Sequence, residues 1–481
     1  MHYGIVRYVL GLILKIEAAL LVLPVLIGLI YREKETIAFV IMAVSCLLVG
    51  TLLTIRKPKK LVFYAREGLV IVALSWVIIS IFGALPFVIN RDIPRFTDAL
   101  FETISGFTTT GASILLNVEE LSHVSLFWRS FTHWVGGMGV IVFMLAILPM
   151  AGGYNAQLMR AESPGPSFGK IRPKVRETAA VLYKIYFGMT VAEIIILLIS
   201  GMHWFDTLCI SFGSAGTGGF GVRADSCGSY TLIQQTIITV FITLFGVNFN
   251  AYYILLLTKD KKAVFKSEEV RWYLLIIAGA IAAITLNIRS SFESLYLAIH
   301  HAAFQVASII TTTGFGTVDF DLWPEFSKGI LVLLMFIGAC AGSTGGGFKV
   351  SRVIILAKSI YRQLIQFIYP RSVSVIKLDG KTADEEIVTG VSTYLATYTF
   401  LFLASILLLT VDHRFDLITD FTAVTATFNN IGPGLAAVGP TRNFADMSTL
   451  SKYVLMFDML AGRLELYPIL MLFVPRIWKK N

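Results

Sequence analysis

Four short tracts rich in glycine, threonine and asparagine are the residues of this sequence best suited to bind a bare cation. They occupy residues 108–112, 216–220, 311–315 and 429–433. Glycine readily takes a positive φ, so each tract can turn carbonyl oxygens toward a common axis, where they replace the water around a monovalent ion. The predicted filter residues are Thr109, Thr110, Gly111, Thr217, Gly218, Gly219, Thr312, Thr313, Gly314, Asn430, Ile431 and Gly432.

The segment before each tract indicates how the tract is positioned. Each contains an amphiphilic stretch of about a dozen residues, which is too short to cross a membrane and is typical of a re-entrant half-helix. Phe101-Glu102 and Phe304-Gln305 precede the glycine of their tracts by the same offset. We therefore interpret the chain as four copies of helix, half-helix, tract and helix. The alternative, that such tracts are ordinary loops or helix-packing faces, is disfavoured by their fourfold recurrence.

Composition places these copies in a membrane. Of 481 residues, 56% are hydrophobic and 15% charged, against about 25% charged in soluble domains. Mean hydropathy is +0.75. Apolar runs without charge, such as 69–88 and 391–411, reach the ~20 residues that a membrane helix needs. The positive charge lies in short loops rather than on one basic face, which argues against nucleic-acid binding. The predicted fold is an all-α polytopic membrane protein.

The length rule predicts ten spans and five units. The first two spans form an N-terminal two-helix pair outside the repeat, and the other eight make four pore domains. The predicted spans are 5–30, 37–55, 67–90, 124–150, 179–200, 232–257, 271–288, 327–368 (interrupted), 387–411 and 449–475. The predicted units are residues 1–60 for the pair and 61–155, 156–262, 263–370 and 371–481 for the pore domains.

Loop charges predict the orientation. Lysine and arginine are in excess in 55–66, 151–178, 258–271 and 349–386, whereas the intervening segments are acidic. Because Lys/Arg-rich loops mark the cytoplasmic side, we expect both termini inside. The outward-facing acids would then enrich cations at the mouth of a pore.

The eighth span is broken by a run of small residues at 338–347. Each glycine costs a helix up to about 1 kcal/mol relative to alanine, so we expect a flexible loop there that blocks or opens the path. A helix-packing surface is the alternative. Arg463 lies inside the last span, where a charge is expensive and usually functional. It is expected either to contact this loop or to pair with Glu465 or Asp458. The predicted gate residues are Gly342, Ser343, Thr344, Gly345, Gly346, Gly347 and Arg463.

A family resemblance agrees with these inferences. The first tract followed by the run from Trp128 to Val140, the third tract, the break at 342–347 and Gly462-Arg463-Leu464-Glu465 resemble the Trk/Ktr/HKT superfamily of potassium transporters. The extra N-terminal pair makes the chain similar to the TrkH branch. The resemblance implies a K⁺ filter formed by the four tracts, a homodimer in a bacterial cytoplasmic membrane, and a cytosolic TrkA-type nucleotide-binding ring that gates the pore. The second and fourth tracts depart from Thr-Thr-Thr-Gly, which leaves their ligand atoms open.

Other functions are less well supported. Residues 216–221 fit G-x-G-x-x-G but lack the strand that a dinucleotide site requires. Four scattered cysteines suggest neither disulfides nor zinc, and adjacent His300 and His301 point in different directions on a helix. No clustered acid–base set suggests an enzyme, and we expect no cofactor. The main alternative is a secondary transporter that couples Na⁺ or H⁺ to a solute by alternating access.

Overall fold

The computed structural model describes residues 1–58, 65–139, 175–257, 261–372 and 374–479. The described part is almost entirely helical, and its strands are one small antiparallel hairpin in which Lys377 pairs with Thr382. Six helices are long and apolar enough to cross a membrane, or up to seven if one bent pair counts as a span. The prediction of an all-α polytopic membrane protein is therefore confirmed.

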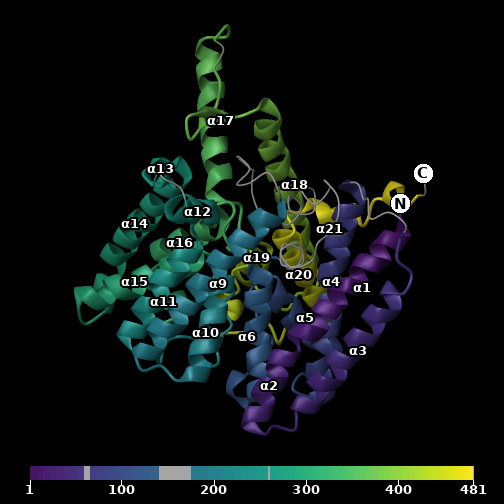
Figure 1. Ribbon diagram of the computed structural model, residues 1–481. Helices are drawn as coiled ribbons and strands as arrows, with labels where there is room; N and C mark the ends of the chain where they lie inside the picture. The colour runs from purple at the N-terminus through teal and green to yellow at the C-terminus, as the bar shows by residue number, and fades with distance from the viewer. Residues whose placement is uncertain (59–64, 140–174, 258–260, 373, 480–481) are drawn as a thin grey trace.

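The helices follow the predicted order of an N-terminal pair and four repeats (Figure 1). In the pair, α1 (Tyr3–Leu20) and α2 (Val22–Tyr31) together form the first span, and α3 (Thr36–Thr54) forms the second. The first repeat contains α4 (Ala65–Asn90), α5 (Phe96–Phe107), η1 (Val118–Glu120) and α6 (His123–Gly137); the second contains α9 (Val175–Ile199), α10 (Trp204–Gly216), α11 (Leu232–Phe245) and α12 (Phe249–Leu257). After α13 (Ala263–Lys266), the third contains α14 (Glu268–Ile288), η2 (Arg289–Ser291), α15 (Leu295–Ile310), η3 (Phe320–Leu322), α16 (Glu325–Ile337) and α17 (Val350–Ile368). After β1 (Lys377–Leu378) and β2 (Lys381–Thr382), the fourth contains α18 (Glu385–Thr410), α19 (Leu417–Phe428), η4 (Ala436–Val438), α20 (Thr449–Arg463), α21 (Tyr467–Met471) and α22 (Pro475–Trp478).

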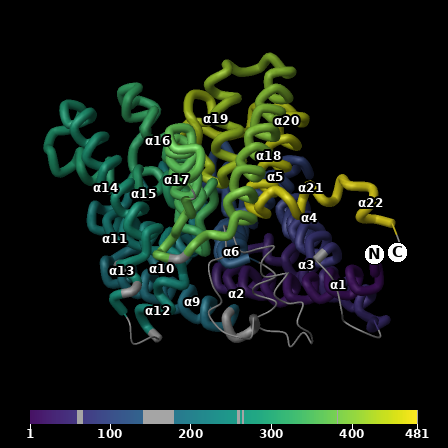
Figure 2. The backbone as a smooth tube through the Cα atoms, turned by 90° about the horizontal axis from the view of Figure 1, so that it is seen from above, coloured from purple at the N-terminus to yellow at the C-terminus, as the bar shows by residue number. Residues whose placement is uncertain are grey.

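The repeats are arranged around a centre. Seen from above, the colours of the chain pass around the molecule from α4 and α5 through α9–α12 and α14–α16 to α18–α20 (Figure 2). The helix after each tract packs against the half-helix of the neighbouring repeat, in the pairs α6–α10, α11–α15, α16–α19 and α20–α5. This set of contacts closes on itself, so the four half-helices, α5, α10, α15 and α19, share one central region.

Local sequence explains where these helices begin. Ser122, Ser294, Asp416 and Ser448 each accept a hydrogen bond from a backbone N–H in the first turn of the following helix. Thr231 and Gln234 form a reciprocal capping box at α11. Each cap satisfies donors that the start of a helix leaves without a partner.

Two predicted spans are not the continuous helices that we expected. The span at 232–257 bends by 92° between α11 and α12. Cys340 N donates to Gly246 O at 3.1 Å and Phe249 N to Gly342 O at 3.0 Å, so backbone groups at the bend bond to the 338–349 loop. The span at 449–475 stops at Arg463 and restarts at Tyr467, because Glu465 and Leu466 take positive φ values of 57° and 64°.

The remaining spans agree with the prediction, except that the span at 124–150 is helical only as far as Gly137, although residues 138 and 139 are also described. The span at 327–368 is interrupted, as expected, between α16 and α17. In the span at 124–150, α6 ends at Gly137, and residues 140–150 lie outside the described residues. The limits of the predicted units, two of which also fall outside the described ranges, stay predictions.

The two ends of the chain lie side by side (Figure 1). The N-terminal amino group of Met1 donates to Lys479 O at 3.2 Å, and the Tyr3 hydroxyl donates to Trp478 O at 2.6 Å. On the upper side of the same view, α17 extends beyond the other helices. Both termini therefore emerge at one end of the molecule.

Candidate functional site

The four half-helices end in one repeated backbone structure. The residue two before each tract glycine takes a left-handed φ, which is 54° at Thr109, 54° at Thr217, 59° at Thr312 and 55° at Asn430. The next residue donates its N–H five residues back at 2.8 Å in every copy: Thr110 to Ser105, Gly218 to Gly213, Thr313 to Ser308 and Ile431 to Ala426. This is the Schellman motif. Departures from Thr-Thr-Thr-Gly in the sequence therefore leave the backbone geometry unchanged.

The backbone conformation at the end of each tract requires glycine, because φ is positive there. It is 80° at Gly111, 81° at Gly219, 80° at Gly314 and 100° at Gly432. A Cβ atom would also collide with the neighbouring repeat in each case. It would lie 2.1 Å from Gly218 O at Gly111, 2.0 Å from Thr313 O at Gly219, 2.0 Å from Ile431 O at Gly314 and 2.8 Å from Thr110 O at Gly432. The order of contacts is first to second, second to third, third to fourth and fourth to first. The four tracts therefore meet as a closed ring of glycines and carbonyl groups.

A single cavity joins the tracts at one end. It has a volume of about 120 Å³, and all four tract glycines line it. The structure thus brings every residue predicted for the filter to one region, where the residue before each glycine contributes a backbone carbonyl. The amide nitrogen of Asn430 is not free for the ring, because Nδ2 donates to Thr110 Oγ1 and Met459 O, both at 2.9 Å.

The mouth of this cavity differs from the acidic mouth that we expected. Among the described residues, the charged side chains that line it are Arg129, Arg223 and Arg442. The acids of these segments hold the loops instead: Asp206 pairs with Arg223 at 3.2 Å. The hydroxyls of Ser448 and Ser451 donate to Asp412 and hold the pKa of Asp412 below its usual value. Arg223 and the two serine hydroxyls thus bind two of the carboxylates that we expected at the mouth.

A buried ion pair braces the first tract against the second. Arg129 Nε lies 2.6 Å from Glu102 Oε1, and both side chains are almost fully buried. Glu102 accepts hydrogen bonds from Ser113 Oγ and Ile114 N beyond the first tract, at 2.9 and 3.0 Å. Arg129 donates to Gly221 O beyond the second tract at 2.9 Å and covers the ring of Phe220. One charged pair therefore fixes the segments that follow both tracts.

The predicted gate loop lies against the inner end of the third and fourth tracts. Gly346 N donates to Thr312 Oγ1 at 2.6 Å. A Cβ on Gly345 would lie 2.8 Å from Thr311 O, and one on Gly346 would lie 2.5 Å from Asn429 O. The C-terminal ends of α15 and α19, which carry partial negative charge, thus face this loop.

Arg463 connects the gate loop to the first repeat. Its Nη1 donates to Thr344 O at 2.7 Å, and its Nη2 donates to Gly136 O at 2.5 Å and Gly137 O at 2.7 Å. Of the alternative partners considered from the sequence, Glu465 binds Arg352, and Asp458 accepts from Ser405 at 2.7 Å. The guanidinium therefore forms a bridge from the loop below the tracts to the end of α6.

Three further charged residues hold the loop and were missed in the sequence. Glu269 Oε1 accepts from Ala341 N at 2.7 Å and from Ser351 N at 3.2 Å, so it clasps both ends of the loop. Lys349 is buried and donates to Gly345 O. Arg352 donates to Phe348 O at 3.1 Å. The sequence does contain a signal for two of them. Lys349 and Arg352 are charged residues that lie just after the glycine run, inside an otherwise apolar span.

The other candidates examined in the sequence do not form sites. His300 contacts Gln235 at 2.8 Å and His301 contacts Thr317 at 3.0 Å. Within the described residues, no group of His, Cys, Asp and Glu side chains could hold a metal ion. The G-x-G-x-x-G residues lie at the end of α10, which is preceded by a membrane helix and not by a strand.

These features define a class of protein: a polytopic helical membrane protein with a fourfold ring of re-entrant backbone loops. The family model described as TrkH, cation transport protein, matches residues 35–480. The Trk system potassium uptake protein TrkH of Salmonella typhimurium is 37% identical over 100% of both chains, and TrkG of Escherichia coli is 30% identical over 99% of both. The crystal structure of the potassium transporter TrkH from Vibrio parahaemolyticus matches 100% of both chains with a TM-score of 0.89 at 33% identity. The chain therefore belongs to the TrkH family of cation transport proteins, and the resemblance inferred from the sequence is confirmed.

Proposed function

We propose that this chain is a potassium-uptake subunit that conducts dehydrated K⁺ through the ring of four tracts. The observation that carries the proposal is the closed order in which each tract glycine faces the carbonyl of the next repeat. Such carbonyl rings replace the hydration shell of K⁺. An inward-negative potential supplies about 2.3 kcal/mol per charge for each 100 mV, so uptake needs no catalysis and no cofactor in this chain. Relatives named as potassium uptake proteins support the same ion.

In this proposal the loop from Gly342 to Gly347 is the gate, and Arg463 holds it closed. The loop lies under the tracts, and the Arg463 guanidinium adds positive charge on the same side. A helix at the end of the loop, α17, extends beyond the body on the side of both termini (Figure 1). We place that side in the cytoplasm, where a TrkA-type nucleotide-binding ring would act on α17 of a homodimer and thereby move the gate.

The test is ⁸⁶Rb⁺ flux into vesicles that contain only this chain. We expect external K⁺ to inhibit ⁸⁶Rb⁺ uptake by competition and external Na⁺ to leave it unchanged. Equal competition by Na⁺ would argue against a potassium filter. Flux that requires a Na⁺ or H⁺ gradient would argue against passive conduction.

A second candidate is H⁺-coupled potassium symport. The observation that favours it is the presence of buried carboxyl groups inside membrane helices, at Glu193 in α9 and Asp458 in α20. A pH-sensitive dye inside the same vesicles separates the two functions. Symport acidifies the lumen in proportion to Rb⁺ uptake when the membrane potential is clamped at zero, whereas passive conduction leaves the pH unchanged.

A further inference from the structure

A polar cleft between the first and fourth repeats lies outside the conduction path. Its volume is about 580 Å³, and it is formed by the N-terminal ends of α5 and α20 together with the loop before α19. The membrane helices α4 and α18 end at Asn90 and Thr410, only a few residues before the two arginines that line the cleft, Arg95 and Arg414. The cleft therefore lies at the boundary between membrane and water.

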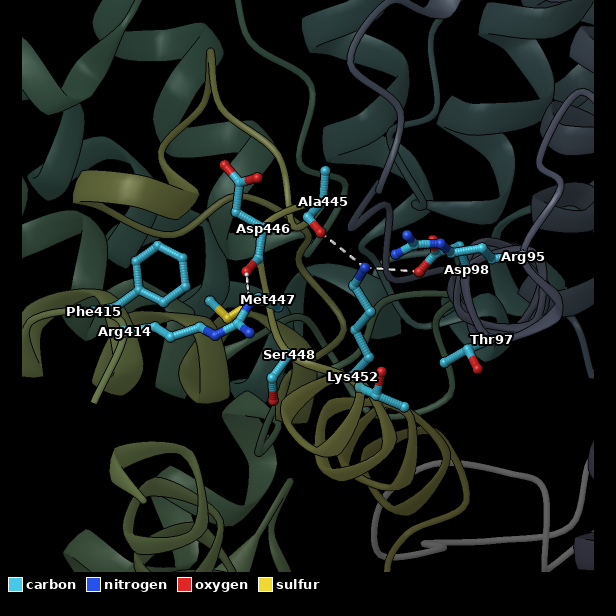
Figure 3. Close-up of a pocket in the computed structure, with 11 residues that line it drawn as sticks. Arg95, Thr97, Asp98, Arg414, Phe415, Ala445, Asp446, Met447, Ser448 and Lys452 are labelled. Carbon is cyan, nitrogen blue, oxygen red and sulfur yellow. Dashed lines mark hydrogen bonds and ion pairs between the residues drawn. The ribbon is translucent and has the colours of Figure 1, made fainter. Parts of the chain in front are cut away.

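We propose that this cleft binds the phosphate group of a membrane phospholipid. Figure 3 shows Arg95 on one side and Arg414 on the other, with Lys452 between them. Lys452 Nζ is held 2.7 Å from Asp98 Oδ1 and 2.8 Å from Ala445 O, so Asp98 balances its charge. The two arginines remain as the groups that a phosphate would bind.

The arginines suit a phosphate ligand. Among the described residues, the Arg414 guanidinium makes one hydrogen bond, in which Nη1 donates to Asp446 O at 3.1 Å. A guanidinium has five N–H donors in a fixed plane, and it binds phosphate oxygens in pairs. Arg414 therefore keeps donors for a ligand, and Arg95 faces it across the cleft. Two acids line the cleft, Asp98 and Asp446; Asp98 is paired with Lys452, so Asp446 is the acid whose charge would repel the phosphate.

The surroundings favour a lipid over a soluble phosphate. The sequence neighbours of the lining residues include Phe96, Leu450 and Tyr453, which are 42%, 46% and 49% exposed. Tyrosine is enriched where a membrane meets water, and the Tyr453 hydroxyl lies 3.4 Å from Thr97 Oγ1, which lines the cleft. A headgroup in the cleft can therefore place its acyl chains on these apolar side chains. This inference is independent of the ion that the chain conducts.

The experiment measures lipid binding to the full chain in detergent by native mass spectrometry, with phosphatidylglycerol, diacylglycerol and inorganic phosphate as probes. Each arginine–phosphate contact is a charged hydrogen bond, so Arg95→Gln/Arg414→Gln should weaken phosphatidylglycerol binding by about tenfold or more. Diacylglycerol binding should not change. Arg289→Gln is the matched control, because Arg289 is an exposed arginine that also directly follows a membrane helix, α14.

A second variant is expected to increase the affinity for phosphatidylglycerol, a result that misfolding could not produce. Asp446→Asn removes the repelling charge but keeps the backbone carbonyl that accepts from Arg414, so phosphatidylglycerol should bind several-fold more tightly. Unchanged binding in both the double variant and Asp446→Asn would overturn the proposal. Inorganic phosphate that binds as tightly as phosphatidylglycerol, and depends on the same arginines, would overturn the assignment to a lipid.

Discussion

The tracts and the gate loop are both glycine-rich breaks in membrane helices, but different interactions hold them. Each tract repeats one backbone structure, with a Schellman cap and a glycine that faces a neighbouring carbonyl. The loop from Gly338 to Lys349 occurs once. Backbone bonds tie it to the bend after α11, and the side chains of Glu269, Thr312 and Arg463 hold it elsewhere. A ring of backbone contacts resists deformation, whereas a few side-chain hydrogen bonds can break together. In the proposed function, this difference lets the tracts act as a rigid filter and the loop act as a movable gate.

The largest effect should come from breaking the ring itself. Gly314→Ser places a side chain at a φ of 80° and only 2.0 Å from Ile431 O. We expect the preference for Rb⁺ over Na⁺ in vesicle flux to fall by about tenfold or more, because the carbonyl ring must open. Gly316→Ser is the matched control, since its Cβ would have no neighbour closer than 3.7 Å. Unchanged selectivity in Gly314→Ser would refute the filter assignment.

The next largest effect should come from breaking the buried ion pair between Glu102 and Arg129, which fixes the first and second tracts. Glu102→Gln leaves the buried Arg129 charge without its partner, which typically costs about 3–5 kcal/mol of stability. We expect a lower melting temperature and a several-fold loss of Rb⁺/Na⁺ selectivity. The neutral pair Glu102→Gln/Arg129→Gln should recover most of the stability. Additive losses in the double variant would show that the two residues act separately.

On the gate side, removing Arg463 should increase flux while selectivity remains. Arg463→Ala deletes the bonds to Thr344 O and to α6, together with a charge below the filter. A barrier lowered by about 1.4 kcal/mol raises the rate tenfold, and we expect roughly that increase in ⁸⁶Rb⁺ flux without any partner. Arg463→Lys, which keeps the charge, should increase flux less. If flux does not change in Arg463→Ala, the residue has only a structural role.

The smallest effect tests the single hydrogen bond between ring and gate. Thr312→Val removes the acceptor for Gly346 N but keeps the shape of the side chain. Loss of one such bond is worth about 1 kcal/mol, so partner-independent flux should rise about threefold with unchanged selectivity. Thr109→Val is the control at the same position of the first tract, where Oγ1 has no hydrogen-bond partner among the described residues. If both variants change the flux equally, the hydrogen bond between Gly346 N and Thr312 Oγ1 has no part in gating.

The sequence was sufficient to predict features that depend on local chemistry. Long apolar runs have to cross the membrane as helices because the backbone has no other partner there. The glycines at 111, 219, 314 and 432 were recognisable because a positive φ strongly favours that residue. The position of the break after Ile337 followed from its run of poor helix formers.

Features that depend on contacts between distant segments could not be predicted in the same way. The run at 232–257 contains only one glycine and no proline, and its bend comes from bonds to a loop about 100 residues later. The role of Glu269 could not be predicted, because its two N–H partners, Ala341 and Ser351, lie 72 and 82 residues later in the chain. Likewise, no spacing rule reveals that Asp206 pairs with Arg223 or that Asp412 accepts hydrogen bonds from Ser448 and Ser451.

The ring is assembled from one polypeptide, in which each quarter is encoded separately. A substitution in one tract therefore changes a single quadrant, whereas in an assembly of four identical subunits it would change all four at once. This freedom lets the second and fourth tracts carry glycine, asparagine and isoleucine where the others carry threonine, while the backbone ring stays closed. If the ring is the filter that we propose, its selectivity can be adjusted one quadrant at a time.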